Sequence, residues 1–367
     1  MDETTTPVAT SAQLGFGFDD GAAAPAAAPS ARPRKPKQPL AAAAPLPAAA
    51  QPAPPVTAPL PDMPALDPSA EAMARQLESH PDYRILRRLP VTTRFAHQPS
   101  GPVTRVLVLD TETTGLEHSR DRIMELAMLL VDVETATGLP TGEVEVYDGL
   151  EDPGIRISRE VEQLTGINDD MVRGQKLDEP RVLAMLARAD LVLAHNAGFD
   201  RPFAEARLPQ FASLPWACSV ADLEWKKEGR SSSRLTQLAL ELGWFYDAHR
   251  AEMDCHALLA VLAAPLPVSG RNGLAHLLGA AGRPGYRLQA TAAPFDAKDV
   301  LKARGYRWDG ANRVWHTRLS DDEKLQAECD WLKAEVYGGR SAQVQVESFD
   351  AFTRYSSRPG QRTARTL

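Results

Sequence analysis

The chain has 367 residues, 43% of them hydrophobic, and a formal net charge of −7, so it is long enough for two domains that each bury a core. It begins Met1-Asp2-Glu3, without the basic start of a signal peptide, and proline interrupts every alanine-rich run, so we expect no secretory or membrane-spanning segment there. Its three cysteines form no Cys-x-x-Cys pair, which disfavours a disulfide framework or zinc site, and we expect a soluble, cytoplasmic protein with no membrane contact.

Composition changes along the chain. Residues 1–68 hold 15 of the 30 prolines among alanine runs that cannot build a packed interior, and we expect a disordered tail there. Residues 69–100 are interpreted as a connector that begins with a short helix. Residues 101–268 carry 16 basic and 28 acidic residues, a net charge of −12, whereas residues 269–367 carry 16 basic and 11 acidic residues, a net charge of +5. Because the two parts have opposite net charge, we expect them to contact differently charged partners.

Strand and helix patterns alternate through residues 101–268, which we interpret as one domain. Apolar, β-rich runs predict strands at residues 103–109, 123–133, 143–150, 191–194 and 216–220. Helical periodicity predicts helices at residues 158–165, 179–189, 200 onwards, 233–242 and 252–263. This order favours an α/β fold in which helices cover both faces of a sheet.

A small α+β module is predicted at residues 283–340. Residues 306–308 are expected to pair with residues 314–318 as a hairpin, with one helix before it and one after it. Residues 341–367 are expected to form a C-terminal tail.

Three short acidic motifs follow one another in the larger domain: Asp110-Thr111-Glu112-Thr113-Thr114-Gly115, Asn196-Ala197-Gly198-Phe199-Asp200 and His249-Arg250-Ala251-Glu252-Met253-Asp254. They supply four carboxylates and one imidazole. Carboxylate oxygens are ligands that Mg²⁺ and Mn²⁺ prefer, and two such cations would balance the four negative charges. This combination can hydrolyse a phosphodiester bond, so the motifs indicate a nuclease.

Asp110 and Glu112 lie two residues apart at the end of a predicted strand. Since side chains alternate along a strand, both carboxylates should point the same way. Two like charges this close raise each other's pKa, and a divalent cation removes that cost. For this motif alone, a solvated strand end is the alternative.

The other two motifs place acidic groups at helix starts. Asp200 follows the strand at residues 191–194, where a helix cap is the alternative. Asp254 shares a helix face with apolar residues 257, 258, 261 and 262, and a carboxylate on a core-facing stripe needs a partner. His249 precedes the same helix. An imidazole with a near-neutral pKa can act there as a general base, although a surface histidine is the alternative.

With all three motifs in order between about Val103 and Ala264, the chain resembles the DEDDh family of 3′-to-5′ exonucleases, and within it the proofreading epsilon subunits of bacterial DNA polymerase III. The resemblance implies an RNase H-like fold, a mixed sheet flanked by helices. It also implies release of nucleoside monophosphates from single-stranded or frayed DNA 3′ ends, in replication or repair, with two divalent cations, Mg²⁺ or Mn²⁺.

The resemblance also implies roles for individual residues. Asp110 would bridge both metals, Glu112 and Asp254 would bind the metal that holds the attacking water, Asp200 would support the second metal, and His249 would deprotonate the water. The terminal nucleotide would be seated by Thr111, Thr113, Leu116, Asn196 and Phe199. The segment Leu164-Thr165-Gly166-Ile167 departs from the family pattern, because many relatives have histidine before Gly-Ile.

Several alternatives stay open. RNA 3′-end trimming would use the same fold and metals, because no residue of the sequence clearly reads a 2′-hydroxyl. A non-catalytic replication scaffold is disfavoured, since all five chemical positions are present. A polymerase subunit is a possible partner.

Two further segments suggest contacts outside the motifs. The peptide formed by Gln13, Leu14, Gly15, Phe16, Gly17 and Phe18 resembles peptides that bacterial proteins insert into the sliding clamp, with an incidental apolar island as the alternative. The C-terminal module offers a mixture of positive charge and rings for nucleic acid, contributed by Arg304, Tyr306, Arg307, Trp308, Arg313, Trp315 and Arg318. For these rings, the core of a small domain is the alternative.

Overall fold

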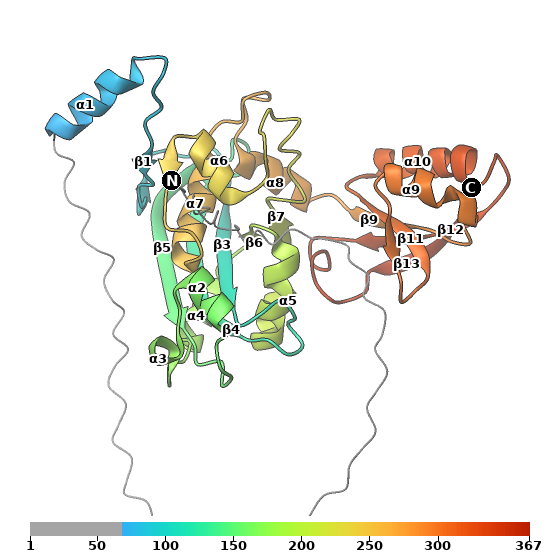
Figure 1. Cartoon of the computed structure of the whole chain (residues 1–367), viewed down its shortest axis with the longest axis horizontal. Helices are drawn as coiled ribbons and strands as arrows, with labels where there is room; N and C mark the ends of the chain where they lie inside the picture. Colours follow the sequence, from blue (N-terminus) through green and yellow to red (C-terminus); the bar gives the residue numbers. More distant parts are fainter. Residues whose placement is uncertain (1–67) are drawn as a thin grey trace, which may run out of the picture. The chain divides into compact units, whose positions relative to one another are not determined.

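A computed structural model of the protein describes residues 68–367. These residues form two large β-sheets, and each sheet packs against its own helices with its own hydrophobic core (Figure 1). Residues 1–67, and with them the predicted clamp peptide at residues 13–18, lie outside the described part of the chain. Between residues 68 and 367, no helix has the length and apolar character needed to cross a membrane.

The connector begins with the predicted helix, α1 (Pro68–Glu78). Arg87 pairs with Glu71 at 3.0 Å and also with Glu78, which ties α1 to the short strand β1 (Arg87–Arg88). Strand β1 pairs in parallel with β8 (Trp244–Phe245) of the following domain. The connector is therefore attached to the larger domain by backbone pairing.

The larger sheet has six strands in the order β2, β5, β4, β3, β6 and β7. Their bounds are β2 (Arg94–Phe95), β3 (Val103–Thr113), β4 (Ile123–Glu134), β5 (Pro140–Leu150), β6 (Leu191–Ala194) and β7 (Trp216–Cys218). Strands β3, β4 and β5 pair antiparallel, whereas β3, β6 and β7 pair in parallel. The sheet is mixed, as predicted.

Alternation along β3 explains how the sheet is covered on both faces. Val106 and Val108 belong to a core shared with α7 and α8, whereas Leu107 and Leu109 belong to a core shared with α4 and α5. The helices of this domain are α2 (Arg159–Thr165), α3 (Asp169–Val172), α4 (Glu179–Leu186), α5 (Ala197–Arg207), α6 (Leu235–Glu241), α7 (Ala251–Ala263) and α8 (Gly273–Ala281), with a 3-10 turn, η1 (Pro209–Ser213). The predicted α/β fold is confirmed.

Helix α5 begins three residues earlier than the sequence predicted. Asn196 adopts a left-handed conformation with φ 69°, and the helix starts at Ala197. Asp200 therefore lies within the first turn of α5 instead of capping it. The start differs from an ordinary capped one, because the N-cap residue Asn196 is left-handed and its side chain makes no capping hydrogen bond.

The C-terminal sheet has five antiparallel strands in the order β10, β11, β9, β12 and β13. Their bounds are β9 (Gly285–Ala290), β10 (Arg307–Asp309), β11 (Val314–Leu319), β12 (Gln343–Phe349) and β13 (Gln361–Thr366). Its helical segments are η2 (Phe295–Ala297), α9 (Lys298–Ala303), α10 (Asp322–Trp331) and the π-helical turn η3 (Leu332–Val336). The predicted hairpin is β10 and β11.

The predicted C-terminal tail at residues 341–367 is wrong. Residues 343–349 form β12 between β9 and β13, so this segment completes the sheet. Strand β13 reads Gln-Arg-Thr-Ala-Arg-Thr and has no apolar alternation, since it is an edge strand held by its backbone pairing with β12. The module therefore extends beyond the predicted boundary at residue 340.

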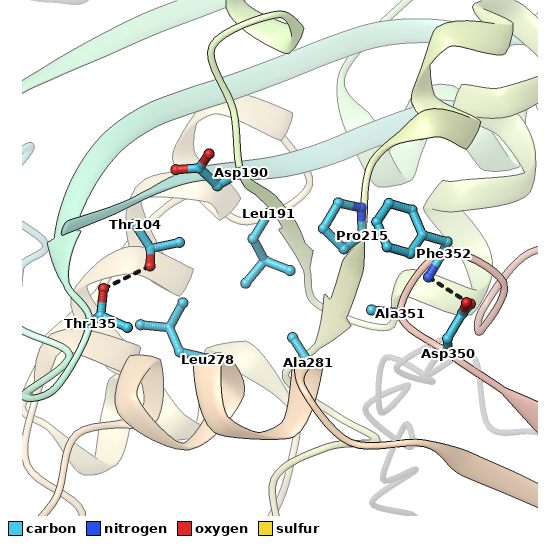
Figure 2. A pocket seen from close by; sticks show the side chains of 10 residues that line it. All are labelled: Thr104, Thr135, Asp190, Leu191, Pro215, Leu278, Ala281, Asp350, Ala351 and Phe352. Atoms are coloured by element: carbon cyan, nitrogen blue, oxygen red, sulfur yellow. Dashed lines mark hydrogen bonds between the residues drawn. The ribbon is translucent and has the colours of Figure 1, made fainter. Parts of the chain in front are cut away.

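The loop between β12 and β13 of the C-terminal module forms hydrogen bonds with the larger domain. The amide of Trp216 in β7 donates to the carbonyl of Ala351 at 2.8 Å, and the guanidinium of Arg201 donates to the carbonyls of Ala351, Phe352 and Arg354. The same loop lines a pocket at the start of β3 (Figure 2). The pocket is lined by Thr104, Thr135, Asp190, Leu191, Pro215, Leu278, Ala281, Asp350, Ala351 and Phe352.

Candidate active site

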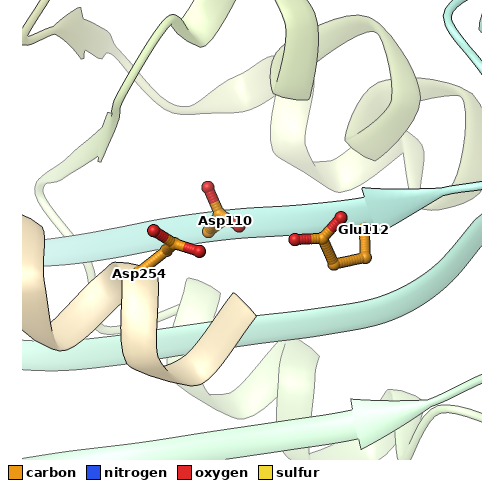
Figure 3. Close-up of side chains that lie close together, drawn as sticks. All are labelled: Asp110, Glu112 and Asp254. Atoms are coloured by element: carbon orange, nitrogen blue, oxygen red, sulfur yellow. The ribbon is translucent and has the colours of Figure 1, made fainter. Parts of the chain in front are cut away.

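The end of β3 carries two carboxylates toward one face of the sheet. Asp110 and Glu112 continue the alternation of Val106 and Val108, so they point toward the face covered by α7. Asp254, in the first turn of α7, approaches from that face. Asp110, Glu112 and Asp254 each offer a carboxylate oxygen within 4.8 Å of the other two (Figure 3).

The carboxylate of Asp254 is held by two hydrogen bonds. The hydroxyl of Tyr246 donates to Oδ1 at 2.8 Å, and the backbone amide of His249 donates to Oδ2 at 2.8 Å. The same face of α7, one and two turns further along, packs against β3 and β4 through Leu258 and Leu262. This packing and these hydrogen bonds fix Asp254 beside the end of β3.

Asp200 reaches the same strand from α5, on the other face of the sheet. Its Oδ1 accepts hydrogen bonds from the amide of Thr111 at 3.2 Å and from the hydroxyl of Thr111 at 2.8 Å. Only 2% of Asp200 is exposed. Asp200 is thus oriented by the residue between Asp110 and Glu112, but it is not one of the three carboxylates that converge within 4.8 Å.

Burial and like charges make these carboxylates hard to ionise. Burial, together with the charges of Asp200 and Asp254, raises the pKa of Asp110 well above its usual value. Burial and the charge of Asp254 raise the pKa of Glu112 to about 8, and burial raises the pKa of Asp200 to about 7. Burial also raises the pKa of Asp254, although the hydrogen bonds from Tyr246 and His249 oppose the shift.

The donor set fits a hard divalent cation. All three converging groups offer oxygen, and oxygens that share an ion at about 2.0–2.6 Å lie at most about 4–5 Å apart, which the observed spread satisfies. A cation there would offset the repulsion that raises these pKa values. The acidic cluster can therefore hold a metal ion.

His249 lies at the rim of the cluster. It is exposed, and its backbone has a left-handed φ of 67°, which is uncommon for a residue with a side chain. The hydrogen bond from its amide to Asp254 holds this conformation in place. Such local strain is often found at functional sites.

The five predicted nucleotide-seating residues differ in exposure and in their bonds within the protein. The hydroxyl of Thr111 donates to Asp200, and that of Thr113 donates to the carbonyl of Gly115 at 2.6 Å, so both are engaged within the protein. Leu116 is 61% exposed, and Asn196 is exposed with no side-chain capping bond. The ring of Phe199 packs against Phe203 with 5.1 Å between centroids.

Three residues at the site escaped the sequence interpretation: Glu125, Tyr246 and Arg250. Glu125, fully buried in β4 opposite Glu112, accepts hydrogen bonds from the guanidinium of Arg250 and from the amide of Ala251 at 2.9 Å. It therefore fixes the start of α7 next to His249. The signal for it was one acidic residue inside the apolar run 123–133.

Comparison with known proteins places these motifs within one matched region. The RNase_T family model, described as an exonuclease, matches residues 107–262. The chain is 30% identical over 163 residues to the DNA polymerase III subunit epsilon of Treponema pallidum. This match covers 41% of this chain and 71% of that protein.

Other matches cover less of the partner protein or show less similarity. A PolC-type DNA polymerase III of Thermotoga petrophila is 29% identical to this chain over 154 residues. The match covers 41% of this chain and 11% of that protein, so this chain spans about a tenth of the relative. The solved structure of exonuclease X in complex with 5′ overhanging duplex DNA is 23% identical and has a TM-score of 0.36, covering 47% of this chain and 97% of that one. This structural likeness is too small to carry a functional argument.

Proposed function

Because this chain belongs to the exonuclease family that includes the epsilon subunit of Treponema pallidum DNA polymerase III, we propose that it removes nucleotides one at a time from DNA 3′ ends, in replication proofreading or in repair. The observation that supports this most directly is the convergence of Asp110, Glu112 and Asp254 within 4.8 Å. Nucleoside monophosphates would be the products.

Two divalent cations, Mg²⁺ or Mn²⁺, are part of the proposal. Asp110, Glu112 and Asp254 would hold one cation, and Asp110 with Asp200 would support the second. When bound, the cations would neutralise charge on the scissile phosphate and activate water for attack. Oxygen ligands of this kind favour these ions over zinc.

The side chains of the protein would then act around the phosphate. His249 would take the proton from the attacking water, a task that suits an imidazole at an exposed rim. The hydrogen bond from the backbone amide of His249 to Asp254 would hold the base at a fixed position next to the metal ligand. Tyr246 would hold the other oxygen of Asp254.

The residues that would seat the terminal nucleotide have different parts. Leu116 and Asn196 are exposed and would contact the base and sugar directly, together with Phe199, whose amide donates to the carbonyl of Asn196 at 2.8 Å. Thr111 and Thr113 would act indirectly, since the hydroxyl and the amide of Thr111 are already bonded to Asp200 and the hydroxyl of Thr113 is bonded to the carbonyl of Gly115.

The test is release of mononucleotides with Mg²⁺ by wild type, Asp110→Ala and His249→Ala, on single-stranded, matched and mismatched DNA 3′ ends. Both variants should lose at least about a hundredfold in rate. Asp170→Ala and His80→Ala are matched controls, because both side chains are exposed and distant in sequence from the motifs. Retained activity in the two site variants would contradict the residue assignment.

A matched RNA oligomer in the same assay separates the two substrate classes. Preferential degradation of RNA would favour the alternative, 3′-end trimming of RNA, over the DNA proposal. No loss of either oligomer would favour a binding scaffold.

Partners remain part of the proposal. A polymerase subunit is suggested by the name of the Treponema pallidum relative. The sliding-clamp prediction concerns Gln13, Leu14, Phe16 and Phe18, which lie outside the described residues. Gln13→Ala combined with Phe18→Ala should weaken clamp binding in a pull-down, and unchanged binding would contradict that prediction.

A further inference from the structure

The C-terminal sheet has one apolar face and one basic face. Leu288 and Ala290 of β9 lie in a core with Leu301 of α9 and Leu332 of η3, so the helices cover that face (Figure 1). Because side chains alternate along a strand, Arg287 and Gln289 point to the opposite face. We call this helix-free side the basic face.

Strand register defines which residues share the basic face. Across the sheet, Arg307 pairs with His316, Arg318 pairs with Arg287, Arg287 pairs with Glu347, and Glu347 pairs with Arg362. Cross-strand partners lie on the same side of a sheet. The basic face thus carries four arginines drawn from four strands, together with Glu347 and Asp309.

Two of the four arginines are occupied by the carboxylates of the face. Arg287 bonds Asp309 at 2.8 Å, and Arg362 pairs with Glu347 at 3.1 Å. The side chains of Arg307 and Arg318 are exposed, and among residues 68–367 no carboxylate forms an ion pair with either guanidinium. The basic face therefore keeps two unneutralised positive charges.

Two nitrogen atoms on the basic face also lack partners. Within the described residues, Nε of Arg287 and Nδ1 of His316 are buried and accept or donate no hydrogen bond. A buried polar atom without a partner is uncommon in a folded protein. Both atoms belong to side chains on the same face as Arg307 and Arg318.

The rings that the sequence suggested for base stacking are on the other side. Tyr306 is 3% exposed and stacks with Trp331 in the module core, and Trp315 packs against that core. Trp308 is 52% exposed, but it is the register partner of Trp315 and so lies on the helix-covered side. None of these rings lies on the basic face, which keeps Arg307 and Arg318 of the residues that the sequence suggested, and arginine binds phosphate.

We propose that the basic face of the C-terminal module binds the phosphodiester backbone of DNA. This proposal rests on the proposed function, because it takes DNA as the substrate whose 3′ end is cut. The face supplies positive charge that the exonuclease domain, with its net charge of −12, does not. Contacts to phosphate carry no sequence information, so binding should be independent of base sequence.

The test is fluorescence anisotropy of the full chain with labelled DNA in EDTA, so that binding is measured without cleavage. Arg307→Glu combined with Arg318→Glu should weaken binding at least about tenfold at low salt. Lys302→Glu combined with Lys333→Glu is the matched control, since both lysines are exposed on the helical segments of the same module. It should bind within about twofold of wild type.

Salt dependence gives a second readout. In Arg307→Gln combined with Arg318→Gln, the slope of log affinity against log salt should fall by about 1.8 on duplex DNA and about 1.4 on a single strand. This variant also serves if the charge-reversed one does not fold, as judged by its circular dichroism spectrum.

Three results would overturn the proposal: unchanged binding by the arginine variants, equal weakening by the lysine control, or a loss on Trp308→Ala as large as that of the arginine pair. The last result would place the contact on the helix-covered side. Failure of nuclease activity with normal, arginine-dependent binding would instead count against the proposed function alone.

Discussion

The backbone amide of His249 donates a 2.8 Å hydrogen bond to Oδ2 of Asp254. This bond joins the proposed general base to a proposed metal ligand within one turn of chain. It also fixes His249 in a left-handed conformation that a free loop would rarely adopt. Changes at Asp254 and its partners should therefore alter both metal binding and proton transfer.

Tyr246→Phe should weaken metal binding, because it removes the hydrogen bond to Oδ1 of Asp254. A hydrogen bond to a charged group is worth about 1.5–3 kcal/mol, so activity at limiting Mg²⁺ should fall by about ten- to a hundredfold. The measurement is exonuclease rate against Mg²⁺ concentration. Tyr286→Phe is the control, since it removes a similar bond to Asp322 in the C-terminal module; an equal effect of both changes would refute the role of Tyr246.

Glu125→Gln should lower activity by perturbing the start of α7. Glu125 is fully buried and bonds both Arg250 and the amide of Ala251, directly after His249. We expect an unfolding free energy lower by about 1–3 kcal/mol, from an unsatisfied buried group, and a changed pH–rate profile. Asp132→Asn breaks the partly exposed ion pair with Arg105 and should cost less than about 1 kcal/mol. A normal pH–rate profile in Glu125→Gln would contradict a positioning role.

Stability of the metal-free protein should fall as pH rises from 6.5 to 8. Burial raises the pKa of Glu112 to about 8 and that of Asp200 to about 7, so the folded state retains protons that the unfolded state has already released. A carboxyl whose pKa is raised on folding contributes its full stabilisation at a pH below its pKa in the unfolded protein. This contribution to the free energy of unfolding is lost as pH rises through the pKa of the folded protein, by up to about 1.4 kcal/mol per pH unit for each group.

The histidine at position 195 does not obscure that window. Burial lowers the pKa of His195 to about 4, so His195 lowers stability only as pH falls below about 6.5. Thermal unfolding in EDTA between pH 6.5 and 8 should therefore report the carboxylates, and Mg²⁺ should flatten the curve because metal-bound carboxylates stay ionised. A metal-free Tm that is constant or rises over this range would disprove the expectation.

Arg201→Ala should release the loop between β12 and β13 from the exonuclease domain. Its side chain is fully buried and donates to three carbonyls of that loop and to Glu205. Loss of a buried ion-pair partner costs about 3–5 kcal/mol, and residues 350–358 should become protease-sensitive and exchange amide protons faster. Arg188→Ala, which removes a partly exposed pair with Glu145, is the control. Unchanged exchange in the loop of Arg201→Ala would show that other contacts hold it.

The sequence predicted the parts of the site that follow from local periodicity. Alternation along a strand was enough to place Asp110 and Glu112 side by side, and helical spacing was enough to turn Asp254 toward the sheet. Glu125 was not found, because its partners lie about 125 residues further along the chain. Contacts between distant segments cannot be read from periodicity.

The C-terminal module shows the same limit. The hairpin of β10 and β11 follows from neighbouring apolar and turn residues and was predicted. Strand β13 was missed because an edge strand needs backbone partners more than an apolar face. The same pairing reveals the basic face, since Arg318, Arg287 and Arg362 meet only once the register of the strands is known.

We propose that Asp110, Glu112 and Asp254 would hold a divalent cation and that the protein removes nucleotides from DNA 3′ ends. The most direct test of this claim is the product ladder of a 5′-labelled DNA strand, comparing wild type with Asp110→Asn at saturating Mg²⁺. We predict that wild type shortens the strand stepwise from its 3′ end and that Asp110→Asn is slower by at least about a hundredfold. An Asp110→Asn ladder that advances at the wild-type rate would contradict the claim.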